Sequence, residues 1–71
     1  MRVVSKKYYY FEEEDKGLFT DFLLENHTKM NDFATLCGIT LAYLSLVING
    51  KRAITPSLMK KFEENGFKVL I

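Results

Sequence analysis

The tetrapeptide Asn49-Gly50-Lys51-Arg52 carries the residues of this chain best suited to holding an anion. The cations of Lys51 and Arg52 attract phosphate oxygens, and the side-chain amide of Asn49 can donate a hydrogen bond to them. Gly50 tolerates a positive φ angle, so the tetrapeptide can form a tight turn. The apolar segment of residues 41–48 precedes it directly. We therefore expect a tight turn that carries two cations at the end of a short helix.

Other side chains that could react or bind a metal stand alone in the sequence. Cys37 is the only cysteine and His27 the only histidine, so neither a disulfide nor a cysteine-based zinc site can form within the chain. The carboxylates of residues 12–15 form a continuous run, which is typical of a solvated surface and not of a pair set across a cleft. We expect that the protein is not an enzyme and that it binds no cofactor, no metal ion and no small-molecule substrate. Cys37 is expected to be buried, and His27 to lie in a loop or at a helix end.

The composition is that of a compact globular protein. With 71 residues, of which 48% are hydrophobic and 14% aromatic, the chain is expected to form one domain over residues 1–71. No apolar run reaches the ~20 residues that span a membrane, and the N-terminal segment lacks the apolar stretch of a signal peptide. We therefore expect a cytoplasmic protein without a membrane partner.

Charge is segregated along the chain although its sum is small. Ten Lys and Arg residues against nine Asp and Glu residues give a net charge of +1. A protein dedicated to DNA usually has a clear basic excess, because neutralising phosphates supplies most of the affinity. Here the acidic run of residues 12–15 is separated from basic pairs at positions 6–7, 51–52 and 60–61. Local fields can therefore attract an anion where the net charge does not.

Hydrophobic periodicity and capping residues predict four helices. Their approximate bounds are Glu13–Asn26, 29–36, 41–48 and 56–64. Thr28, Thr40 and Thr55 are expected as the N-caps of the last three helices, because a threonine hydroxyl can accept a hydrogen bond from a free amide of the first turn. Pro56 suits the first position of the fourth helix. Gly38 is expected to end the second helix with a positive φ angle.

Apolar residues at helical spacing predict the core of this bundle. They are Leu18, Phe19, Phe22, Leu23, Phe33, Leu36, Leu44, Val47, Leu58, Met59 and Phe62, with Ile39 and Ile54 filling gaps beside them. The β-branched and aromatic segments 2–11 and 67–71 predict extended chain, which could pair as a two-stranded ribbon. The tyrosines at positions 8–10 are expected to pack over one end of the domain. A free edge of such a ribbon would suit dimerisation.

The segment around residues 29–50 resembles the motif of the Cro/repressor-type helix-turn-helix family, also called the XRE family. The resemblance rests on Phe33-Ala34, the turn residue Gly38, the apolar pair Leu44 and Val47, and the end Asn49-Gly50-Lys51. It extends over about residues 15–65. It implies a mainly α fold, a compact bundle of four or five helices of the phage-repressor DNA-binding type. The second helix of such a motif enters the major groove of DNA, often from each half of a dimer.

Matching the motif residue by residue implies which side chains would meet DNA. The implied DNA-binding residues are Thr40, Leu41, Ala42, Ser45, Asn49, Lys51 and Arg52, and Met30 stands where the family often has a donor to phosphate. The chemistry departs from the family at the bases. Direct recognition of guanine or adenine needs Arg, Lys, Asn or Gln, and residues 41–48 include none of these. Leu41, Ala42 and Leu46 can touch only thymine methyls or another apolar surface.

Three interpretations of this apolar face are open. In the first, a dimer binds operator DNA through Lys51 and Arg52, with modest or indirect specificity. In the second, which we favour, the face binds another regulator and thereby blocks the DNA binding of that regulator. The residues expected to contact such a partner are Met30, Leu41, Ala42, Tyr43 and Leu46. In the third, these residues are buried in the fold or in a homodimer.

The resemblance to the family implies a biological role for the second interpretation. Very short members of the family occur in temperate phages as early-lytic partners of a larger repressor, and the chain is similar to the modulator-of-repression type. The resemblance thus implies a transcription regulator of a lysis/lysogeny switch in a bacterial host cell. It would act as an anti-repressor that binds its cognate repressor, with possible contact to operator DNA and a possible homodimer. A Cro-like dimeric repressor that binds operator DNA is the alternative.

Overall fold

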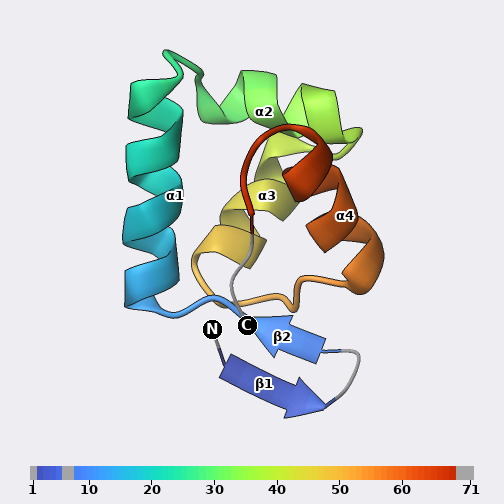
Figure 1. Cartoon of the computed structure of the whole chain (residues 1–71). Coiled ribbons are helices and arrows are strands. Elements are labelled where there is room, and N and C mark those ends of the chain that lie inside the picture. The colour runs from blue at the N-terminus through green and yellow to red at the C-terminus, as the bar shows by residue number, and fades with distance from the viewer. Residues whose placement is uncertain (1, 6–7, 69–71) are drawn as a thin grey trace.

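The computed structural model describes residues 2–5 and 8–68 of the chain. Within them a short β-hairpin is followed by four helices (Figure 1). The elements are β1 (Arg2–Ser5), β2 (Tyr8–Tyr10), α1 (Glu13–Glu25), α2 (Met30–Cys37), α3 (Leu41–Ile48) and α4 (Pro56–Glu64). The predicted mainly α fold is confirmed. The predicted helix bounds agree with the observed ones to within one residue.

Two of the three predicted threonine caps are present. The hydroxyl oxygen of Thr40 accepts a hydrogen bond of 3.1 Å from the Tyr43 amide at the start of α3. That of Thr55 accepts one of 3.2 Å from the Leu58 amide at the start of α4, where Pro56 occupies the first helical position. Such caps satisfy amides that have no partner within the helix, and each contributes about 1 kcal/mol. These two helix starts are therefore set by local sequence.

The predicted cap at Thr28 is wrong. Lys29, in extended conformation, precedes α2 and has no side-chain capping bond. The Thr28 hydroxyl instead donates to the Asn26 carbonyl at 3.0 Å, and His27 has a φ angle of 51°. The Thr28 hydroxyl is therefore used within the turn between α1 and α2, and it does not cap α2. His27 is exposed in this turn, as predicted.

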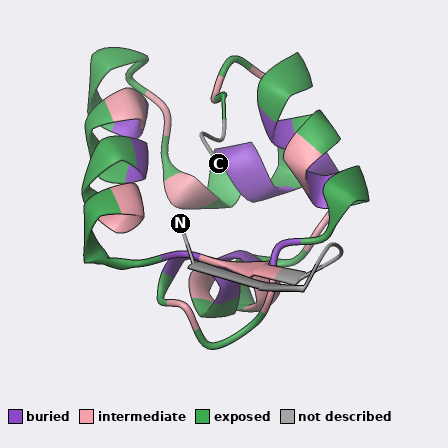
Figure 2. Cartoon of the chain, turned by 60° about the horizontal axis from the view of Figure 1, so that its bottom comes forward, coloured by how far each residue is buried: buried purple, intermediate pink, exposed green. Residues whose placement is uncertain are grey.

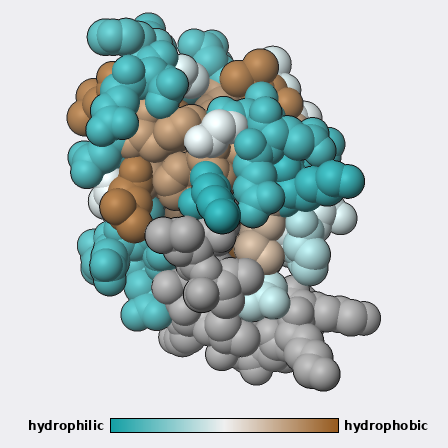
Figure 3. All heavy atoms as spheres, viewed as in Figure 1, coloured by the Kyte–Doolittle hydropathy of each residue, from teal (hydrophilic) through white to brown (hydrophobic). Residues whose placement is uncertain are grey.

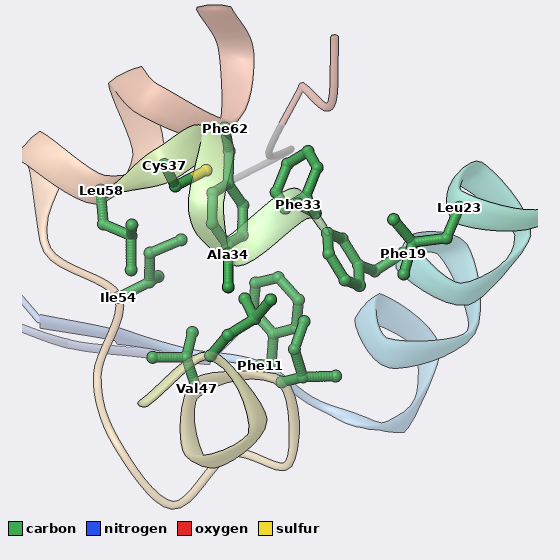
Figure 4. Packing of buried hydrophobic residues seen from close by; sticks show 12 residues of the cluster. Phe11, Phe19, Leu23, Phe33, Ala34, Cys37, Val47, Ile54, Leu58 and Phe62 are labelled. Carbon is green, nitrogen blue, oxygen red and sulfur yellow. The ribbon is translucent and has the colours of Figure 1, made fainter. Parts of the chain in front are cut away.

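Phenylalanine rings form the centre of the core (Figure 4). Phe19 of α1, Phe33 of α2 and Phe62 of α4 are less than 2% exposed, and their ring centroids lie 5.2–5.6 Å apart in pairs. Phe11, between β2 and α1, adds a fourth ring at 6.4 Å from those of Phe19 and Phe62. The Phe19 and Phe62 rings are stacked and the other pairs are edge-to-face, and both arrangements stabilise beyond the buried area. Buried residues accordingly face inward on the helices in Figure 2, with exposed residues outside.

Two leucines that were predicted to be buried are exposed. Leu18 is 49% exposed and Leu36 is 61% exposed, so both predictions are wrong. A helix in so small a bundle buries only a narrow stripe. Leu18 lies about 100° around α1 from Phe19, and Leu36 lies about 60° around α2 from Phe33, on the side away from Ala34. In α2 the inward position that Leu36 was predicted to share with Phe33 is filled by Cys37, which is buried as expected.

Isolated apolar side chains are common on the surface of this protein. Leu24 is 71% exposed, and Figure 3 shows apolar residues reaching the surface in separate groups among hydrophilic ones. Scattered leucines of this kind are normal in monomeric proteins and mark no site by themselves. A functional argument about an exposed leucine therefore needs a second observation from its position.

The β structure differs from the predicted ribbon. β1 and β2 pair antiparallel with each other, so the predicted extended segment is instead two strands, Arg2–Ser5 and Tyr8–Tyr10. On its other side β2 contacts Ile54, whose amide donates to the Tyr9 carbonyl at 2.8 Å. A two-stranded hairpin is marginal by itself, and this hydrogen bond joins the hairpin to the loop before α4. Of the segment predicted to pair with it, Phe67 and Lys68 lie outside any strand, and residues 69–71 lie outside the described part of the chain.

Candidate nucleic-acid and protein interface

The helix α3 is held against α2 by a sharp turn. Gly38 ends α2 with a φ angle of 72°, and the Ile39 amide donates to the Ala34 carbonyl at 3.0 Å. The chain bends by 104° between the two helices, within the range of a helix-turn-helix. Leu44 and Val47 are fully buried and fix which side of α3 faces the core. The opposite side of α3 is consequently directed away from the bundle.

This outward side of α3 is apolar. Leu41 is 44% exposed and Leu46 is 37% exposed, and Ala42 is exposed between them. Burial of these residues within the fold, one form of the third interpretation, is therefore wrong. Of the two hydroxyls nearby, that of Thr40 is already used in the helix cap, and Ser45 is half-buried. The apolar surface predicted from the sequence is thus present on α3, and we call Leu41, Ala42 and Leu46 the α3 face.

Met30 and Tyr43, which were also predicted to bind a partner, occupy a different kind of position. Both are half-buried and pack against the core cluster. Met30 begins α2, and the Tyr43 amide is the one bonded by the Thr40 hydroxyl. Each therefore has a structural role and offers only part of its side chain to a partner.

The turn after α3 presents two cations. Lys51 and Arg52 are exposed, and their amides donate to the Leu46 carbonyl at 2.9 and 3.3 Å. Gly50 has a φ angle of 73°, and a Cβ atom placed on it would lie 2.6 Å from the Phe11 carbonyl oxygen. Glycine is required there both by conformation and by this close approach of two backbone segments. The backbone is thus held at a fixed place while the cations remain available to an anion.

Asn49 is bonded on both sides of its amide. Its Nδ2 donates to the Ser45 carbonyl at 2.8 Å, and its Oδ1 accepts a hydrogen bond of 2.7 Å from Nζ of Lys16 on α1. The sequence analysis did not identify Lys16. No local pattern could have done so, because the two residues are 33 positions apart.

A hollow of about 360 Å³ lies where α1 begins and α3 ends. Its lining consists of Phe11, Glu12, Glu13, Lys16, Ile48, Asn49 and Gly50. Glu12 and Glu13 of the acidic run are thus close to the C-terminal end of α3, a juxtaposition that the sequence did not predict. These two acids favour a basic group at the hollow itself, whereas Lys51 and Arg52 on the following turn favour an anion.

Metal-ligating side chains and the thiol of Cys37 are the other groups of the described residues that could do chemistry. Among them, no group of three or more His, Cys, Asp or Glu residues is placed to hold a metal ion. Burial raises the pKa of the Cys37 thiol, and the nearby charge of Lys61 and a hydrogen bond from Asn65 oppose this effect only in part. A thiol in this state is a poor nucleophile. No single helix of residues 2–5 and 8–68 is long and apolar enough to cross a membrane, and α2 and α3 pass that test only when joined across their bend.

Comparison with known proteins assigns the family. The chain matches the helix-turn-helix family over residues 21–65, which is more than half of its length and includes α2, α3 and α4. The chain therefore belongs to this family, and the resemblance to its Cro/repressor-type branch is confirmed. Such domains are regulatory and bind DNA, so the protein is a DNA-binding transcription regulator. No curated protein and no solved structure gives a significant match.

Proposed function

We propose that this regulator acts as an anti-repressor, or modulator of repression, in the lysis/lysogeny switch of a temperate phage in the cytoplasm of its host. It binds the cognate repressor through the α3 face and contacts DNA in a supporting role. The observation that carries the proposal is the exposure of Leu41, Ala42 and Leu46 where a DNA-reading helix normally presents polar side chains.

Energetics favour a protein over DNA as the occupant of the α3 face. Full burial of a leucine side chain stabilises by about 1.5–3 kcal/mol. With 44% of Leu41 and 37% of Leu46 still exposed, covering both contributes roughly 1 kcal/mol each. A protein partner can cover them completely. In a major groove, the only apolar groups available to them are thymine methyls.

The charge around the α3 face favours a basic protein surface. Glu12 and Glu13 line the hollow at one end of α3. A repressor carries cations on the surface that binds DNA, because those cations neutralise phosphates. Acidic residues at that end of α3 complement such a surface, while the exposed Lys51 and Arg52 on the following turn leave a supporting contact with DNA possible. This arrangement supports a repressor as partner, with its DNA-binding surface covered in the complex.

Binding of operator DNA by a Cro-like dimer is the second candidate. Its support is the turn at Lys51 and Arg52, where two exposed cations follow a fixed backbone. Contacts of this kind position a protein on DNA but carry no sequence information. Specificity would then come from the shape and deformability of the operator.

Calorimetry with one pair of variants tests the proposal. Wild-type protein, Leu46→Asp and Leu24→Asp are each titrated into the repressor encoded beside this protein, into that repressor's operator duplex, and into both together. Leu24 is a matched control because it is an exposed leucine on α1. We expect Leu46→Asp to abolish binding to the repressor and Leu24→Asp to retain it, with the helical circular dichroism of both unchanged.

Three results would contradict the proposal. Unchanged binding by Leu46→Asp removes the α3 face from the interface. Loss of helical circular dichroism in that variant shows that the residue is needed for the fold. Binding of wild-type protein to the duplex but not to the repressor favours the Cro-like candidate.

A further inference from the structure

We propose that Lys16 is a positioning residue for the turn of Lys51 and Arg52, and that it acts through Asn49; the effect on DNA binding rests on the DNA contact proposed above for this turn. The bond of 2.7 Å between Lys16 Nζ and Asn49 Oδ1 joins the first half of α1 to the end of α3. Asn49 itself therefore has a positioning role in place of the direct phosphate contact predicted for it.

The amide of Asn49 is committed within the protein. Its oxygen accepts from Lys16, and its nitrogen donates to the Ser45 carbonyl at 2.8 Å, with the Ser45 hydroxyl oxygen 3.4 Å away. Turning this amide toward a phosphate would break at least one of these bonds. Hydrogen bonds that involve a charged group are among the stronger ones, so the arrangement resists such a change.

The C-terminal end of α3 determines the backbone positions of Lys51 and Arg52. Gly50 follows Asn49 and lies against the Phe11 carbonyl, and the amides of Lys51 and Arg52 bond to the Leu46 carbonyl. The hydrogen bond from Lys16 to Asn49 is thus a third constraint on the turn, beside the two backbone ones. Without this bond the turn has more conformational freedom, and fixing the turn again when DNA binds costs free energy.

The surroundings of Lys16 favour positioning over direct contact with phosphate. Lys16 is half-buried and lines the hollow together with Glu12, the N-cap residue of α1, and Glu13, the first residue of α1. These acids oppose the approach of a phosphate to the ammonium group. The last turn of α3 has no basic residue of its own, so this cation also complements the negative end of the helix dipole.

Salt-dependent DNA binding separates the two roles. The probes are a duplex enriched from a random library by the wild-type protein and a random-sequence duplex of equal length. The variants are Lys16→Met, Lys51→Met and, as a control for loss of one exposed cation elsewhere, Lys60→Met on α4. Loss of a phosphate contact lowers the affinity and also lowers the steepness of log K against log salt, by about 0.9 for one contact. Loss of a positioning residue lowers the affinity alone.

We expect Lys16→Met to weaken binding to both duplexes by roughly threefold to tenfold relative to Lys60→Met, with the wild-type salt slope. Lys51→Met should lower the slope by about 0.9. Lys16→Arg should restore the affinity, because a guanidinium can also donate to Asn49. An affinity equal to that of Lys60→Met, or a slope reduced by about one in Lys16→Met, would overturn the proposal.

A double-mutant cycle tests whether Lys16 acts through Asn49. If it does, Asn49→Ala and the double variant Lys16→Met/Asn49→Ala bind DNA equally well, whereas independent roles give additive losses. Amide hydrogen exchange gives a measurement without DNA. Lys16→Met should speed the exchange of the Lys51 and Arg52 amides and leave that of the Leu58 amide in α4 unchanged. Equal protection in the variant and the wild type would also overturn the proposal.

Discussion

Substitution of three glycines by alanine provides a quantitative test of the backbone at the end of α3. Gly50 and Gly38 have nearly equal φ angles, 73° and 72°. A non-glycine residue in this left-handed region costs about 1–2 kcal/mol. The two sites differ in their neighbours. A Cβ at Gly50 would lie 2.6 Å from the Phe11 carbonyl oxygen, whereas one at Gly38 would have nothing within 4 Å.

The expected losses of stability follow from this difference. Gly38→Ala should lower the free energy of unfolding by about 1–2 kcal/mol, from conformation alone. Gly50→Ala adds a clash with backbone, which cannot move aside as a flexible side chain can. Overpacking of this kind costs a further 1–3 kcal/mol or so, for a total of about 2–5 kcal/mol. Gly17→Ala, within α1 and with nothing within 4 Å of its Cβ, should stabilise by about 0.5–1 kcal/mol.

Urea denaturation followed by circular dichroism measures these differences. The slope of unfolding free energy against urea should be unchanged in the three variants, so that midpoints report stability directly. Equal losses in Gly50→Ala and Gly38→Ala would refute the close approach of the turn to Phe11. A destabilised Gly17→Ala would refute the open surroundings of that residue.

Two further predictions concern the cations of the turn and the buried thiol. The double change Lys51→Ala/Arg52→Ala should weaken DNA binding on all sequences alike and flatten the salt slope by roughly 2, and an unchanged slope in gel-shift titrations would exclude both residues as phosphate contacts. Because burial raises the pKa of Cys37 above its ordinary value of 9.0, the folded state favours the protonated thiol. That contribution is fully present below pH 9.0 and is lost as the pH rises through the folded-state pKa. Cys37→Ala should therefore lose less stability than the wild type between pH 8 and 10 in thermal denaturation, and parallel pH profiles would contradict the assigned shift.

The helices could be predicted well because their ends depend on neighbouring residues. Thr40 and Thr55 cap through the amide three positions ahead, and Gly38 allows the positive φ angle that ends α2. The wrong prediction of a cap at Thr28 also has a local cause, because His27 takes a left-handed conformation and the Thr28 hydroxyl bonds within the turn. Errors at such sites shift a helix by one residue and leave the fold intact.

The apolar residues were harder to assign, because periodicity gives the width of a stripe only approximately. Leu18 and Leu36 fall close enough to the inward side of their helices to be predicted as core. Their exposure depends on how many neighbours each helix has, and that number comes from the packing of the whole bundle. The pairing of β2 with Ile54 depends likewise on a contact between segments far apart in the sequence.

For the candidate site, the sequence by itself determined the helix-turn-helix, the apolar α3 face and the two cations that follow it. Each of these is a property of one continuous stretch, with spacing fixed by helix geometry and by the conformational freedom of glycine. Only the tertiary structure decided what stands beside that stretch. It brings Lys16 to Asn49 and places Glu12 and Glu13 at the end of α3. Hydrogen bonds and fields act through space, so groups separated by 33 positions meet only once the core has placed α1 against α3.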